Sequence, residues 1–225
     1  MSFENWEDKA RDSKFVCSWS GGKDSCLALY RASRLGQPVK LFTMFNETGL
    51  KSRSHGLSLP LLRLQAEALG IPHVIGAAAW GNYETEFTEA LGRLREEGVQ
   101  TAVFGDIDIE EHGRWEEKVC TAAGLKLCLP LWQNNRRELV AEFIALGFKA
   151  MIVTVNERML SPDYLGRELS RRLLKELEEE GVDPCGENGE FHTVVLDGPV
   201  FRRPLLPKLG EVQRHQGYSF LTLTV

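Results

Sequence analysis

The sequence predicts an α/β fold built on a parallel sheet, and two observations carry this prediction. Amphipathic stretches repeatedly stop at a glycine and a short β-rich run follows a few residues later, which is the helix and strand alternation of parallel sheets. Several of these runs are apolar on both faces, as strands covered by helices on both sides are. The rhythm breaks after residue 181. We therefore expect a smaller α+β domain after the parallel one, with domains at residues 1–130 and 131–225.

The predicted elements begin with a short apolar run, residues 14–19, as the first strand. Helices commonly end on a left-handed residue that only glycine adopts without a steric cost. Glycines placed for this role are Gly36, Gly70, Gly98, Gly124 and Gly147. The runs after them are predicted strands, at residues 38–45, 72–77, 101–105, 125–129 and 148–155. Apolar side chains at helical spacing predict helices over residues 83–94 and 139–146. Residues 193–196 and the tail ending FLTLTV are β-rich.

The composition excludes several classes of protein. The chain has 225 residues, of which 43% are hydrophobic, and its 32 acidic and 27 basic side chains give a formal charge of −5. This balance lacks the basic excess of nucleic-acid-binding surfaces, so no nucleic-acid partner is expected. No apolar run approaches a membrane span and the N-terminus is polar, so we expect no membrane association and a cytoplasmic location. Five scattered cysteines without a CxxC pair predict reduced, buried thiols.

The segment Ser20–Ser25 (SGGKDS) joins the first predicted strand to a helix and has the composition of an anion site. Its glycines allow close approach, Lys23 supplies positive charge, and a helix N-terminus points N–H groups at the same place. Ser20 and Ser25 can donate to phosphate oxygens, while Asp24 can cap the helix. The segment is not a Walker A loop, because Asp24 stands where that pattern has Ser or Thr. An ordinary glycine turn without a ligand is the alternative.

This segment resembles the PP-loop of the ATP pyrophosphatases, in the adenine nucleotide α-hydrolase-like superfamily, whose fold is a Rossmann-like sheet of the HUP type. The resemblance implies that the chain binds ATP and Mg²⁺ and cleaves ATP between the α and β phosphates. It implies catalytic roles for Lys23 and Asp24, with Asp24 as the magnesium ligand. The implied nucleotide site comprises the phosphate loop residues Ser20, Gly21, Gly22, Lys23, Asp24 and Ser25, and the strand backbone beside adenine at Phe42, Thr43 and Met44.

Two further residues follow a predicted strand, Gly105 and Asp106. Ligands of open α/β sheets bind beyond the carboxyl ends of the strands, so both are expected at the nucleotide site. Asp106 could instead cap the next helix.

A second polar segment, Glu187–Thr193 (ENGEFHT), gathers two carboxylates, an amide, an imidazole and a hydroxyl around glycines. Loops of this kind are often sites. A solvated turn leading into a strand is the alternative. A zinc site using Cys185 and His192 is weaker, because no second cysteine or histidine pair completes the set.

Together with SGGKDS, the second segment resembles the GEGGEFET-type motif of the diphthine–ammonia ligase family, a branch of the PP-loop enzymes. The resemblance extends in order over nearly the whole chain, through residues 65–72, 105–107, 117–120, 130–132, 165–166 and 197–201. It implies a ligase that adenylates a carboxylate on a small molecule or protein with release of pyrophosphate. Attack of ammonia on the acyl-adenylate then gives the amide and releases AMP. The resemblance also implies catalytic roles for Glu187 and Glu190, and leaves a homodimer open.

The acceptor carboxylate is expected to contact side chains from several segments. The expected residues are His55, Glu117, Trp132, Asn188, His192 and Thr193. His55 lies in a basic loop that could equally be a solvated one. Trp132 ends a predicted strand, where it could be pocket wall or core.

Departures from the family pattern gather where an acceptor would be recognised. Asn188 stands at the second glycine of the family motif, and His192 at its later glutamate. Where diphthine-type members usually have a Gln-Arg pair followed by a further Arg, this chain has His112, Gly113 and Trp115. The sequence therefore predicts ATP-dependent adenylation and leaves the identity of the acceptor, diphthine included, open.

Two rival functions remain. An RNA-modifying PP-loop enzyme is disfavoured by the acidic balance and the absent cysteine pairs. A regulatory module that holds ATP without turnover is disfavoured by Lys23, Asp24 and the carboxylate-rich second segment, because a sensor needs affinity but no acceptor site.

Overall fold

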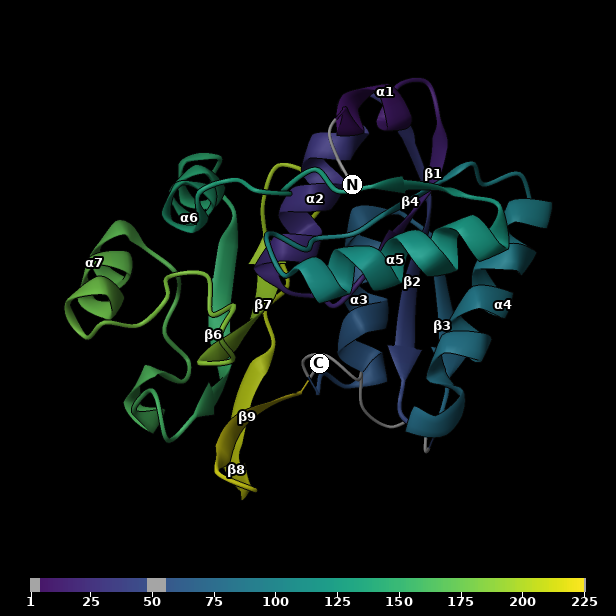
Figure 1. Cartoon of the computed structure of the whole chain (residues 1–225). Helices are drawn as coiled ribbons and strands as arrows, with labels where there is room; N and C mark the ends of the chain where they lie inside the picture. The colour runs from purple at the N-terminus through teal and green to yellow at the C-terminus, as the bar shows by residue number, and fades with distance from the viewer. Residues whose placement is uncertain (1–4, 48–55, 225) are drawn as a thin grey trace. The chain divides into compact units, whose positions relative to one another are not determined.

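The chain forms two compact units in a computed structural model that describes residues 5–47 and 56–224 (Figure 1). The first unit comprises Met1–Ser20, Asp24–Leu59 and Ile71–Gln133. The second comprises Gly21–Lys23, Pro60–Gly70 and Asn134–Val225. The expected domains at residues 1–130 and 131–225 stay a prediction, since compact units need not be domains that fold alone.

The first unit is built on a five-stranded parallel sheet in the order β3-β2-β1-β4-β5. Its strands are β1 (Lys14–Ser18), β2 (Gln37–Phe45), β3 (His73–Ala77), β4 (Thr101–Val103) and β5 (Lys126–Cys128). Its helical elements are α1 (Trp6–Ala10), α2 (Lys23–Ser33), η1 (Trp80–Asn82), α4 (Tyr83–Glu96) and α5 (Glu110–Ala123). This unit confirms the predicted Rossmann-like α/β class.

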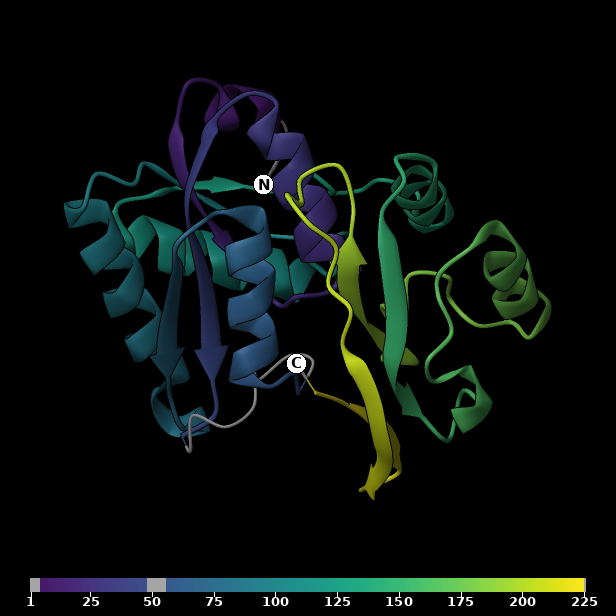
Figure 2. The same cartoon turned by 180° about the vertical axis from the view of Figure 1, so that it is seen from behind.

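The strand order reverses direction at β1, from which the chain first builds β2 and β3 on one side and later β4 and β5 on the other. Helices α4 and α5 lie side by side on one face of the sheet (Figure 1), and α2 lies on the opposite face (Figure 2). The neighbouring carboxyl ends of β1 and β4 mark the position where open α/β sheets bind ligands.

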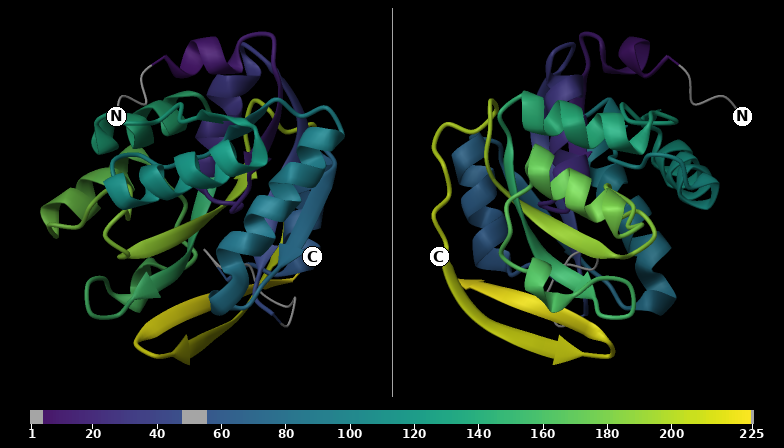
Figure 3. Two further views of the ribbon diagram at one scale, coloured as in Figure 1. Left: turned by 45° about the vertical axis from the view of Figure 1, so that its right-hand side comes forward. Right: turned by 90° about the vertical axis from the view of Figure 1, so that its left-hand side faces the viewer.

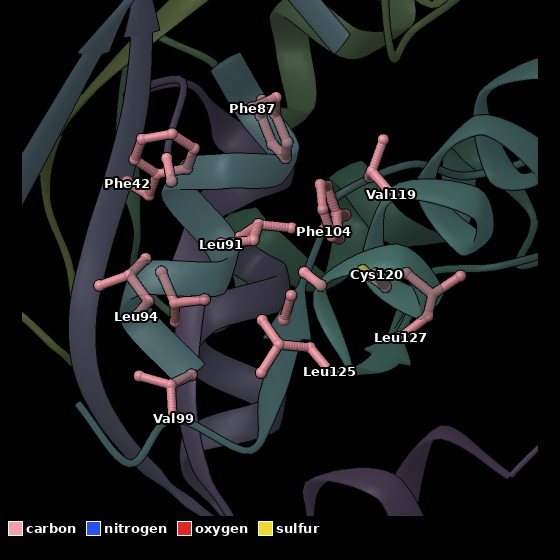
Figure 4. Packing of buried hydrophobic residues seen from close by; sticks show 14 of the residues in the cluster. Phe42, Phe87, Leu91, Leu94, Val99, Phe104, Val119, Cys120, Leu125 and Leu127 are labelled. Carbon is pink, nitrogen blue, oxygen red and sulfur yellow. The ribbon is translucent and has the colours of Figure 1, made fainter. Parts of the chain in front are cut away.

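Apolar side chains of α4 and α5 fill the space over the sheet (Figure 4). Phe87 and Leu91 of α4 and Val119 of α5 are almost fully buried. Phe42 of β2 meets Phe87 edge to face, with ring centroids 5.1 Å apart. This core fixes the strand ends on which the site residues stand.

The second unit is built on a four-stranded antiparallel sheet in the order β7-β6-β9-β8. Its strands are β6 (Lys149–Asn156), β7 (Phe191–Asp197), β8 (Lys208–His215) and β9 (Tyr218–Thr224). Its helical elements are α3 (Leu59–Leu69), α6 (Arg136–Ala145), η2 (Pro162–Tyr164) and α7 (Arg171–Glu179). Helices α6 and α7 lie on one side of this sheet (Figure 3), where Arg137 Nε and Glu178 Oε1 are 2.6 Å apart. The unit confirms the predicted α+β part.

The predicted strands are confirmed with small shifts at their ends. Four of the five helix-ending glycines have the expected positive φ, namely Gly70, Gly98, Gly124 and Gly147. The prediction for Gly36 is wrong, since its φ is not left-handed. A Cβ on Gly36 would lie 2.8 Å from the Ser13 carbonyl oxygen and closer still to that of Ala10, so glycine is needed there for close backbone packing.

The cysteines and the helices agree with the composition. All five cysteines are free and buried, as predicted. Burial raises the pKa of Cys120 and of Cys128 to about 12, which keeps both thiols protonated. Within residues 5–47 and 56–224, no helix has both the length and the apolar character that crossing a membrane would require.

Candidate functional site

The loop after β1 connects the two units covalently. Ser20, Asp24 and Ser25 belong to the first unit, and Gly21–Lys23 to the second. Gly21 has a φ of 83°, a conformation that glycine adopts without strain. In the first unit, the Ser20 and Ser25 hydroxyl oxygens are 3.0 Å apart. Helix α2 begins at Lys23, so its first N–H groups belong to this loop, as an anion site requires.

Lys23 is held within the second unit, and its side chain is 5% exposed. Its ammonium donates to the Cys185 carbonyl and lies 5.7 Å from the centre of the Phe191 ring. Its backbone N–H donates to Thr193 Oγ1 over 3.1 Å. The second unit thus brings the lysine of the first motif against the segment that carries the second motif, although about 160 residues separate them in sequence.

Gln65 of α3 fixes the glycine part of the loop. It is fully buried, and its Nε2 donates to the carbonyls of Gly21, at 3.0 Å, and Val195, at 2.7 Å. The Val195 N–H donates to the same Gly21 carbonyl over 2.9 Å. The sequence prediction did not assign Gln65 a role. An amide among the buried leucines of α3 was the available signal, because a buried amide needs partners.

Glu190 organises the second motif from inside. It is 3% exposed, and its Oε1 accepts from the Asp183 N–H at 3.3 Å and from Asn188 Nδ2 at 2.9 Å. Its Oε2 accepts from the Asn188 N–H at 3.0 Å. Both carboxyl oxygens therefore bind groups of the same loop. This arrangement favours a positioning role for Glu190 over proton transfer.

Asp183 continues this network outside the predicted motif. Its carboxylate accepts from the N–H groups of Cys185, at 3.0 Å, and Glu187, at 3.2 Å, and pairs with Arg136 of α6. Arg136 also donates to Asn188 Oδ1 over 3.2 Å. Asp183 and Arg136 were not predicted as site residues. No local sequence signal marks them, since α6 and the loop meet only in the folded unit.

His192 lies on β7 beside Thr193, which is buried. Burial and the positive charge of Lys23 together lower the pKa of His192 to about 4. The imidazole is therefore neutral at physiological pH, and it can accept a hydrogen bond from a ligand or donate one.

In the first unit, the end of β2 carries the residues expected beside adenine. Phe42 and Met44 point their side chains into the core, so only their backbone could meet a nucleotide. Thr43 Oγ1 donates to the Trp19 carbonyl over 2.6 Å and lies 2.8 Å from His73 Nε2. Pairing with β1 ends at Phe42, whereas β2 continues to Phe45. The β2 backbone therefore runs past the end of β1, as the adenine prediction requires.

Gly105 packs directly against the start of α2. A Cβ at this position would lie 2.7 Å from Asp24 C and from Ser25 N, closer than such atoms approach. A glycine is therefore required here for the β4 end to approach the phosphate loop.

Asp106, the next residue, is tied to α5. Its Oδ1 lies 2.8 Å from Nδ1 of His112, and it also hydrogen-bonds the carboxyl of Glu116, which is 3% exposed. Burial disfavours ionisation of Asp106, but the bonds from His112 and Glu116 outweigh it and lower its pKa. Burial, and then the charge of Asp106, raise the pKa of Glu116 well above its ordinary value. Ile109, not Asp106, is the N-cap of α5, so capping is not the role of Asp106.

Glu116 was not predicted, whereas its neighbour Glu117 was. Glu117 is partly exposed and Glu116 is buried. The signal for Glu116 was its place on the apolar stripe of α5, three and four residues before the buried Val119 and Cys120.

The remaining residues from the sequence analysis either pack against the core of the first unit or lie outside the described residues. Trp132 is partly buried and packs against the apolar core of the first unit. Trp115 packs on Phe87, with ring centroids 5.0 Å apart, and on Tyr83. His55 lies outside the described residues.

The acidic side chains of the described residues determine where Mg²⁺ could bind. Within the described part of the chain, no three His, Cys, Asp or Glu side chains come together as a metal site. Mg²⁺ at nucleotide sites is usually held by one or two carboxylates together with phosphates, so the single carboxylate of Asp24 fits it.

Family models match the chain along most of its length. The diphthamide synthase N-terminal domain matches residues 13–127, and the diphthamide synthase C-terminal domain matches residues 135–223. Relatives named diphthine–ammonia ligase are similar throughout. The protein from Mus musculus is 29% identical over 89% of this chain and 85% of its own, and that from Homo sapiens is 27% identical over the same shares. The Schizosaccharomyces pombe protein is 28% identical over 92% of this chain and 38% of its own.

A solved structure described as a predicted subunit of tRNA methyltransferase from Methanocaldococcus jannaschii is similar with a TM-score of 0.49 and 16% identity, over 86% of this chain and 100% of the other.

The two family models together cover both units of the chain. The chain therefore belongs to the diphthamide synthase family and, with its ligase relatives, is an ATP-dependent amide ligase.

Proposed function

We propose that this chain joins ammonia to a carboxylate in two steps. The carboxylate first attacks the α-phosphorus of ATP, giving an acyl-adenylate and pyrophosphate. Ammonia then displaces AMP to form the amide. Most of the catalysis is positioning and charge neutralisation, because the reacting phosphates and carboxylate repel one another. We place this reaction in the cytoplasm.

The observation that carries the proposal is the start of α2. There a buried lysine, a glycine in a left-handed conformation and two hydroxyl groups lie within one short loop at the end of a central strand. In this assignment Ser20, Gly21, Gly22 and Ser25 hold the β and γ phosphates, and Lys23 and Asp24 neutralise charge during adenylation. The β2 backbone at residues 42–44 meets adenine, and Gly105 and Asp106 border the nucleotide.

Magnesium is proposed to bind through Asp24 and the phosphates. When bound, it would neutralise charge on the leaving pyrophosphate. Lys23 supplies charge at the same place from the protein itself.

The acceptor is proposed to meet the second motif. Asn188, His192 and Thr193 offer neutral donors and acceptors, and Glu187 supplies a carboxylate. Glu117 and Trp132 stay predicted acceptor contacts. Glu190 is assigned to positioning, because its oxygens bind its own loop. The curated relatives are named for diphthine. The changed residues at positions 112, 113, 115, 188 and 192 favour a different carboxylate for this chain.

The first test is the nucleotide product. Purified protein is incubated with Mg-ATP, ammonium chloride and fractions of a cell extract, and AMP is resolved from ADP. AMP and pyrophosphate that depend on one fraction support the ligase. ATP binding without AMP from any fraction supports a regulatory module instead, and loss of AMP after ribonuclease treatment of the active fraction supports an RNA-modifying enzyme.

Lys23→Ala tests the phosphate loop. A lost charge-assisted contact is worth about 1.5 to 3 kcal/mol, so ATP affinity is expected to fall about 10- to 100-fold while AMP affinity changes little. Isothermal titration calorimetry measures both. Lys126→Ala, an exposed lysine on β5, is the matched control and should leave both affinities unchanged. Equal losses for ATP and AMP in Lys23→Ala would contradict the assignment.

A further inference from the structure

One polar cluster of the first unit contains two residues, His112 and Glu116, that have no assigned role in the adenylation step. It consists of Asp106 after β4 and of His112 and Glu116 on α5, one turn apart on the same helix face. Its position is next to the phosphate loop, since Gly105 touches the peptide between Asp24 and Ser25 and Asp106 follows directly.

The contact between His112 and Asp106 fixes the imidazole in one form. Asp106 is ionised and can only accept, so the 2.8 Å contact requires a proton on Nδ1 of His112. In the neutral ring the lone pair then lies on Nε2, the atom that can take up a proton. A carboxylate that orients an imidazole in this way is the arrangement by which a histidine becomes an effective general base.

Glu116 completes the arrangement from the buried side. Its raised pKa keeps it protonated, so its hydroxyl donates to the Asp106 carboxylate. Its Oε2 is buried and has no hydrogen-bond partner among the described residues. A neutral acid at this place holds the Asp106 carboxylate in position without competing for the imidazole proton.

We propose that His112 is the general base of the amidation step, oriented by Asp106 and Glu116 as positioning residues. This inference rests on the ligase function proposed above. When the ammonia nitrogen bonds to the acyl carbon, it carries a positive charge and one surplus proton. His112 Nε2 takes this proton, the bond between the acyl carbon and the AMP oxygen breaks, and AMP leaves with the electron pair. The products are the neutral amide, AMP and a protonated imidazole.

The orientation of His112 is tested on the ligand-free full chain by nitrogen NMR of the histidine rings. In the native protein, neutral His112 is expected to carry its proton on Nδ1. Asp106→Asn should shift the proton toward Nε2, the form common in free imidazole side chains. His215, exposed on β8, is the internal reference and should not respond. Native His112 protonated on Nε2 would overturn the proposal.

The role of His112 as general base is tested with His112→Gln and the extract fraction that supports AMP formation by the native protein. In a single turnover, with enzyme in excess over ATP, the rate of pyrophosphate formation is expected to stay within a few-fold of native, while the rate of amide formation from ammonium falls about 10²-fold or more. Hydroxylamine should restore product, because its adduct is more acidic and gives its proton to water. Arg114→Gln, an exposed neighbour on α5, is the matched control.

The possible results distinguish a wrong role for His112 from a wrong ligase function. Native AMP formation with unchanged amide in His112→Gln overturns the role of His112 alone. An equal loss of pyrophosphate and amide in the single turnover would mean that His112 acts in adenylation, which also overturns its role as the base of amidation. A native protein that forms no AMP with any fraction overturns the ligase function and this inference together.

Discussion

Two buried glutamates, one in each unit, have carboxyl groups with opposite hydrogen-bonding environments. Glu190 in the second unit and Glu116 in the first are both 3% exposed. The oxygens of Glu190 accept three hydrogen bonds from N–H donors of its own loop. Glu116 faces a second carboxylate, and its Oε2 has no hydrogen-bond partner in the described chain.

The difference shows that burial alone does not decide the state of a carboxyl group. Where the loop supplies N–H donors, the carboxyl oxygens accept from them and hold the backbone of the loop in place. Where the surroundings are apolar and the neighbour is negative, the pKa of Glu116 rises and the neutral acid becomes a donor. The first arrangement shapes a loop, and the second holds the carboxylate of Asp106 in place.

Glu190→Ala is expected to give the largest effect. It leaves the N–H groups of Asp183 and Asn188 without their acceptor inside a folded loop. Asp183 is partly buried and Asn188 is exposed, so each of the three lost hydrogen bonds costs about 1 kcal/mol, and the free energy of unfolding should fall by about 2 to 4 kcal/mol. Urea denaturation followed by circular dichroism measures it.

Glu179→Ala is the matched control for that variant. Glu179 is exposed on α7, and its ion pair among the described residues is with Lys175 across one helical turn, at 3.4 Å. Such pairs contribute about 0.5 kcal/mol or less. A loss in Glu190→Ala no larger than in this control would mean that the loop does not depend on the Glu190 carboxylate.

The contrast between these glutamates also marks where sequence prediction succeeds. The parallel sheet, both motifs and four of the five helix-ending glycines follow from local pattern, because period and turn chemistry are properties of short segments. Gly36 and Gly105 are glycines for another reason, close tertiary approach, which no local pattern contains. Strand β8 was not predicted, because all its residues are exposed and it has no apolar alternation.

The site residues, too, could be predicted where their signal is local and could not be where it depends on tertiary contact. The phosphate loop and the residues 187–193 could be found, because their chemistry is written in consecutive residues. Gln65, Asp183 and Glu116 could not be assigned roles, since each acts on a group that is distant in sequence or on another turn of a helix. The local signal for Gln65 and Glu116 is a polar residue on the apolar stripe of a helix, and Asp183 has none.

His192 differs from both glutamates, because it is buried beside the positive charge of Lys23. Its pKa of about 4 is below the ordinary 6.5. Between these pH values the unfolded chain binds a proton that the folded chain does not, so the free energy of unfolding falls as the pH falls. The loss attributable to this group is about 3 kcal/mol at most across that range.

Urea denaturation at a series of pH values measures this dependence. His192→Gln should flatten the slope between pH 4 and 6.5, the two values that bound the window, whereas His215→Gln, on exposed β8, should leave it unchanged. An identical slope in native protein and His192→Gln would mean that His192 is protonated in the folded chain.

Glu116→Gln is expected to give the smallest effect at neutral pH, and the most informative one. A neutral glutamine keeps a donor for Asp106, so the free energy of unfolding should change by about 1 kcal/mol or less. In the native chain, folded Glu116 retains a proton that the unfolded chain releases, so stability falls as the pH rises above the ordinary value of 4.5. Glu116→Gln removes that decline. Glu190→Gln, by contrast, places an amide N–H against N–H donors and should destabilise the chain throughout this range. Equal losses in the two glutamine variants would mean that Glu116 accepts hydrogen bonds as Glu190 does, and the distinction between a loop-shaping carboxylate and a neutral donor would be wrong.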